Sequence, residues 1–153
     1  MEDPLIETWR IHDRIHRYLL TAISDDSLSA AITPKFRNVS KLFAHIHNVR
    51  LMWLQSAAPD LLEGLSKLEA AVESREALEA SLTKSGEAIA TLIARSRATG
   101  DRVKGFKPHV HAFVGYLIAH EAHHRGQIGW TLKAAGTPLD KKTAFGLWEW
   151  GVR

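Results

Sequence analysis

The sequence predicts an all-α fold in which four helices form a bundle. Apolar residues recur at helical spacing in four segments, and no segment alternates apolar and polar residues for the length of a strand. Short stretches rich in Gly, Pro, Ser and Asp separate these segments. At a rise of about 1.5 Å per residue, segments of about 20 to 28 residues form helices about 30 to 40 Å long, as in four-helix bundles.

The ends of the predicted helices follow from local capping and breaking residues. Pro4 suits a first helical turn, Asn38 is a good N-cap, and Gly100 is a residue type that commonly follows a helix C-terminus. Residues 61–72 connect the second helix to the third, and their number allows a long crossover connection. The four predicted helices cover residues 4–24, 38–57, 74–100 and 109–135.

Length and composition predict one domain over residues 1–153, because 153 residues with 45% hydrophobic content suffice for one compact core but not for two. No run of uncharged apolar residues reaches the ~18 that a membrane span needs, so no membrane association is expected. The first residues, Met1 to Pro4, carry acid where a signal peptide carries base. We therefore expect a soluble cytoplasmic protein.

The formal charge of +3 arises from basic residues scattered among acidic ones. Binding to nucleic acid needs cations clustered on one face, so we do not expect a nucleic-acid partner. The densest basic stretch is expected to form a solvated helix face; it consists of Lys35, Arg37, Lys41 and Arg50. Sequence motifs for a serine nucleophile, a phosphate-binding loop or a dinucleotide site do not occur.

The chain has no cysteine and nine histidines, which leaves His, Asp and Glu as possible metal ligands. At about 100° per residue, His120 and His124 lie about 40° apart on the last predicted helix, on the side of its apolar residues. Two imidazoles one turn apart can converge on one metal ion. His123 lies at the edge of this face and suits a supporting role better.

A third ligand is available on the second predicted helix, where His45 flanks the apolar stripe. Facing helices of a bundle bring inward side chains together, so His45, His120 and His124 are the expected metal ligands. Three protein ligands leave a position for water or substrate, which is typical of catalytic rather than structural sites. Zinc, nickel, copper and iron all suit such a set.

Several alternatives remain open at this point. His12 and His16 have the same four-residue spacing on the first predicted helix, and either pair could be the chelate. His109 and His111 are read as helix-end residues. Glu121 is expected to be a solvated helix residue; the alternative is that it orients a metal ligand or acts as an acid or base. Gln127 could form a hydrogen bond near the site. Glycines within the last helix suggest close helix contacts; they are Gly115, Gly126 and Gly129.

Two stretches of the sequence resemble the DinB/YfiT-like superfamily of damage-inducible and thiol-transferase-related four-helix bundles. The first stretch runs from Leu42 to Leu54 and contains His45; the second runs from His120 to Ile128 and includes His-His-Arg-Gly-Gln. The resemblance extends over nearly the whole chain. It implies a divalent metal, nickel or zinc, held by His45, His120 and His124, with His47 as a less favoured alternative to His45.

The resemblance also indicates what kind of activity to expect. Relatives include transferases and isomerases that use low-molecular-weight thiols, so we expect a thiol-dependent transferase or a hydrolase acting on a small molecule. The alternative is a non-catalytic, stress-associated protein that binds metal or ligand. Family members are often homodimers, and such a contact could involve Trp130, Trp148 and Trp150, which could equally cap the bundle.

Overall fold

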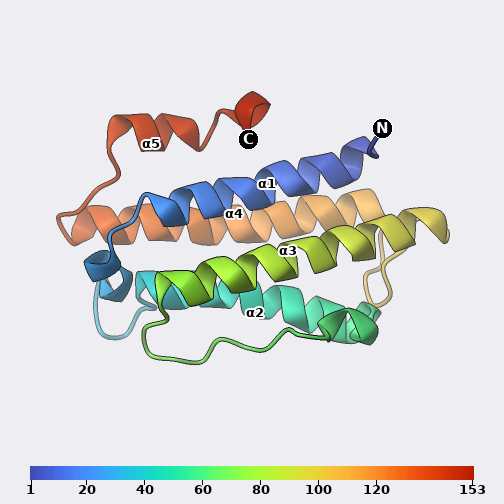
Figure 1. Cartoon of the computed structure of the whole chain (residues 1–153), viewed down its shortest axis with the longest axis horizontal. Coiled ribbons are helices and arrows are strands. Elements are labelled where there is room, and N and C mark those ends of the chain that lie inside the picture. The colour runs from blue at the N-terminus through green and yellow to red at the C-terminus, as the bar shows by residue number, and fades with distance from the viewer.

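The computed structural model describes residues 1–153 and contains helices but no strands. Four long helices run side by side, and a short fifth helix lies over α1 near the C-terminus (Figure 1). The helices are α1 (Pro4–Thr21), α2 (Val39–Ala57), α3 (Arg75–Ala98), α4 (Val110–Ala134) and α5 (Lys141–Gly146). The predicted all-α four-helix bundle is confirmed.

Local side-chain caps fix where the long helices begin. Asp3 accepts a hydrogen bond from the Leu5 amide at 2.9 Å. The side chain of Asn38, the predicted N-cap, accepts one from the Lys41 amide at 2.7 Å. Each cap satisfies an amide that has no partner inside its helix. The first helix ends at Thr21 rather than Ser24, because the chain turns into a 3₁₀ helix, η1, over Asp25–Ser29.

The segment between α2 and α3 runs back along α2 (Figure 1). His47 Nε2 lies 2.8 Å from the Ser66 carbonyl oxygen, near the beginning of this return path. Further along, Ser40 Oγ accepts a hydrogen bond from the Glu73 amide at 2.7 Å. As the segment advances, its hydrogen-bond partners lie closer and closer to the start of α2.

Packing among the four long helices completes the bundle: α1 packs against α3 and α4, and α2 packs against the same two helices.

The core consists of two apolar clusters separated by a polar layer. One cluster is centred on residues such as Trp9, Leu54 and Phe113, and the other on residues such as Leu19 and Phe43. Every long helix passes from one cluster to the other, and buried polar residues occupy the turn between them. In chain order these are His12, Asp13, His16, Arg50, Ser85, Glu121 and His124. The polar layer crosses the bundle at mid-height and positions the candidate site.

Candidate metal centre

Three histidines from two helices converge at one edge of the polar layer. His45 comes from α2, and His120 and His124 come from α4 one turn apart. Each offers a ring nitrogen, and these atoms lie within 4.8 Å of one another; His120 Nε2 and His124 Nε2 are 3.2 Å apart. His124 is buried, whereas His45 and His120 are only partly buried. We call these residues the three-histidine site; its nitrogens face a common centre that solvent can approach.

Gln127 determines which nitrogen of His124 is free. Its Oε1 lies 2.7 Å from His124 Nδ1. A carboxamide oxygen only accepts hydrogen bonds, so Nδ1 carries the proton and Nε2 presents its lone pair toward His120. Histidines that bind metals commonly have their second ring nitrogen fixed in this way. The donor set therefore fits a divalent metal ion.

The imidazoles of the three-histidine site are neutral at pH 7. Partial burial, together with the nearby charge of Arg37, lowers the pKa of His45 from 6.5 to about 4. Burial also lowers the pKa of His120 and of His124, and Arg37 contributes to both shifts. Because a metal binds the neutral imidazole, protons compete little for these nitrogens at neutral pH.

A second group lies deeper in the polar layer. His12 Nε2 and His16 Nε2 are 3.1 Å apart, and they lie 3.2 and 3.1 Å from Glu121 Oε1. By distance alone this group could also hold a metal ion. Its carboxylate already has a cationic partner, since Arg50 donates to Glu121 Oε1 at 2.7 Å and to Oε2 at 2.9 Å.

Arg50 also donates to Asp13 Oδ1 at 2.9 Å, so one guanidinium joins two carboxylates inside the bundle. We call His12, Asp13, His16, Arg50 and Glu121 the buried charge cluster. Burial alone would raise the pKa of Glu121, but Arg50 outweighs it and holds that pKa well below 4.5. Glu121 is therefore a paired carboxylate at neutral pH.

Comparison with protein families decides where the chain belongs. The DinB family model matches residues 1–144. The chain belongs to the DinB family. Comparison with curated proteins gives no match. DinB membership confirms the resemblance found in the two histidine-containing stretches, but a shared fold does not specify a reaction, so the function must be argued from the site.

Two sequence-based expectations about this DinB protein are wrong. Glu121 was expected in solvent but is 1% exposed, and Arg50, expected on a solvated face, is fully buried. The reason is their mutual pairing across 71 positions of the sequence, which no local pattern reveals. Only helical spacing could have indicated that Arg50 is buried. It lies four residues after Ile46 and four before Leu54, both of which are buried on the same face of α2.

The remaining histidines lie outside the three-histidine site. His47 is held by the Ser66 carbonyl in the segment that returns along α2. His109 is the N-cap of α4, as expected for a helix-end residue, and its Nδ1 accepts from the Ala112 amide at 3.2 Å. His111 is exposed. The exposed ring of His123 lies 5.0 Å from that of His124, so His123 stands at the rim of the site.

Proposed function

We propose that this DinB family protein is a metal-dependent enzyme that acts on a small molecule, with one divalent metal held by His45, His120 and His124. The observation that carries the proposal is the convergence of three neutral imidazoles within 4.8 Å, one of them oriented by Gln127. All-nitrogen donors suit nickel or zinc. Three protein ligands leave room for a further ligand, as in catalytic sites.

The three-histidine site suits this role better than the buried charge cluster. In the cluster Arg50 contacts both oxygens of Glu121, so a divalent cation there would meet a positive charge beside its only carboxylate ligand. His12 and His16 are also fully buried, which excludes a substrate from contact with them. We therefore assign the buried charge cluster a structural role, in which it holds α4 against α1 and α2.

The chemistry follows from the residues that this chain offers. The chain has no cysteine, so the nucleophile is water or a low-molecular-weight thiol supplied from solution. A bound divalent metal would supply Lewis acidity, which lowers the pKa of a water or thiol ligand. Gln127 keeps His124 oriented, and exposed His123 is available to exchange protons at the rim. The proposed reactions are thiol-dependent transfer and hydrolysis.

The activity is tested on metal-stripped protein with and without added zinc or nickel. Glutathione with an aromatic halide tests thiol transfer, and a nitrophenyl ester tests hydrolysis. We expect turnover only after reconstitution, with loss in His45→Ala and retention in His111→Ala, an exposed histidine outside the site. Full activity in the stripped protein would contradict the proposal. Saturable binding without product would favour the non-catalytic, stress-associated binding protein instead.

We also propose that the protein is a homodimer. Three large apolar side chains are mostly exposed: Trp130 at 69%, Phe145 at 71% and Trp148 at 78%. Contact between two copies would remove this apolar surface from water. Sedimentation equilibrium tests the proposal, and a mass of one chain at micromolar concentration would contradict it.

None of the helices could span a membrane. That the protein is cytoplasmic is a prediction from the sequence.

A further inference from the structure

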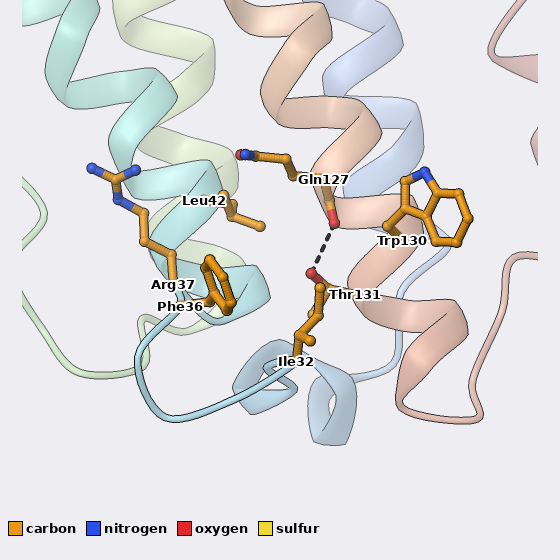
Figure 2. A pocket seen from close by; sticks show the side chains of 7 residues that line it. All are labelled: Ile32, Phe36, Arg37, Leu42, Gln127, Trp130 and Thr131. Carbon is orange, nitrogen blue, oxygen red and sulfur yellow. Dashed lines mark hydrogen bonds between the residues drawn. The ribbon is translucent and has the colours of Figure 1, made fainter.

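A pocket of about 260 Å³ lies where the loop before α2 meets the second half of α4 (Figure 2). Its walls come from that loop, from the first turn of α2 and from the α4 turn that follows His124. They consist of Ile32, Phe36, Arg37, Leu42, Gln127, Trp130 and Thr131. The pocket is slightly smaller than the ~300–1,000 Å³ typical of sites for drug-sized ligands, so its ligand is a smaller molecule.

The pocket adjoins the three-histidine site on both helices. Gln127 lines the pocket while its Oε1 lies 2.7 Å from His124 Nδ1. Leu42 lies one helical turn before His45 on α2, so the two side chains share one helix face. In Figure 2 the Gln127 side chain extends from α4 toward α2, above Leu42. A ligand in the pocket would therefore have one end beside the histidines.

Charge in the pocket comes from one residue. Arg37 is the only ionisable side chain in its wall, and no carboxylate lies within ion-pair distance of it. An exposed guanidinium without a partner can bind a carboxylate through paired hydrogen bonds. Ile32 and Phe36 are exposed apolar side chains of the same pocket wall, so they can cover an apolar ligand body.

We propose that this pocket binds a small organic carboxylate, with the carboxylate on Arg37 and the apolar body against Phe36 and Ile32. As a binding site it depends only on the pocket. As the substrate site it rests on the proposed metal-dependent function, because Gln127 in the pocket wall contacts His124. The substrate class is a small amphipathic carboxylic acid.

The test compares 4-phenylbutyrate with its uncharged amide, 4-phenylbutanamide, by calorimetric titration of the full chain with and without zinc. We expect the acid to bind about tenfold more tightly, the difference that one charge-assisted hydrogen bond supplies. Arg37→Gln should abolish this preference, and Arg37→Lys should retain part of it. Lys41→Gln removes an exposed cation that does not line the pocket and should preserve the preference. Phe36→Ala should weaken both ligands equally.

Equal affinity for acid and amide, or a preference that survives Arg37→Gln, would overturn the proposal. A preference that needs zinc and ignores Arg37 would also overturn it, because the carboxylate would then bind the metal. Metal content is measured on the same samples. An Arg37-dependent preference in protein that binds no metal would support the pocket while the proposed function fails. Metal uptake without any preference for the acid would reject the pocket alone.

Discussion

Gln127 holds the proton of His124 on Nδ1, so metal affinity should depend on a side chain that is not itself a ligand. We expect Gln127→Leu to weaken zinc affinity about 10- to 100-fold, as for other residues that orient metal-binding histidines. Gln127→Glu keeps the acceptor and should retain most of the affinity. Competition with a chromophoric chelator measures both. Gln55→Leu, on an exposed position of α2, is the control, and equal affinity in all variants would contradict the assignment.

The lowered pKa of His16 predicts how the free energy of unfolding depends on pH. Burial lowers this pKa from 6.5 to about 3. Between these values the unfolded chain binds a proton that the folded chain does not, so stability falls as pH falls. The contribution of His16 has a limiting slope of about 1.4 kcal/mol per pH unit. Urea unfolding at pH 7, 6 and 5 measures the slope, which should be shallower in His16→Gln. An unchanged slope would refute the prediction.

Helical spacing alone predicted that His120 and His124 share a face and that Gln127 lies near it, because these relations lie within one helix. The position of His45 beside them was predictable only on the assumption that α2 and α4 face each other. The roles of Arg50 and Glu121 were not predictable in this way. Each becomes buried because the other neutralises its charge, and that pairing depends on packing between helices.

At the scale of helices, Gly86 of α3 lies so close to α1 that it has no room for a side chain. A Cβ atom built there would lie 2.6 Å from the Asp13 carboxyl group, which Arg50 holds in place. We expect Gly86→Ala to destabilise the protein by about 1–3 kcal/mol through this overlap, although alanine is the better helix former. Gly115→Ala has open space and should stabilise by about 0.5–1 kcal/mol. Denaturant unfolding compares them, and equal stabilisation would contradict the close approach.

The glycines of α4 were expected to mark close helix contacts, and this expectation is wrong. A Cβ atom at Gly115, Gly126 or Gly129 would meet no atom of a neighbouring helix within 4 Å. A glycine inside a helix shows where the helix is weakened but not which face packs closely, so the sequence alone could not single out Gly86. Helix starts were more predictable, because Asn38 and Ser74 cap amides only three residues away.

At the scale of the molecule, Arg50 of the buried charge cluster links all four long helices. It lies on α2, pairs with Asp13 on α1 and Glu121 on α4, and donates to the Leu82 carbonyl and to Ser85 Oγ on α3. Arg50→Met would leave Asp13 and Glu121 buried without their cation, and we expect a loss of about 3–5 kcal/mol in unfolding free energy. Arg95→Met is the matched control, because Arg95 pairs with Asp60 in solvent and should contribute about 0–1 kcal/mol. Urea unfolding measures both. Similar losses in the two variants would show that the cluster does not hold the bundle together.

The metal content of the purified protein tests the central claim most directly. Elemental analysis is made on protein prepared without an affinity tag and on four variants, each checked for helical content by circular dichroism. The variants are His45→Ala, His120→Ala, His124→Ala and His12→Ala. The proposed site predicts about one nickel or zinc ion per chain, lost in the first three variants and retained in the fourth. Loss in His12→Ala alone, or no metal even after incubation with zinc or nickel, would contradict it.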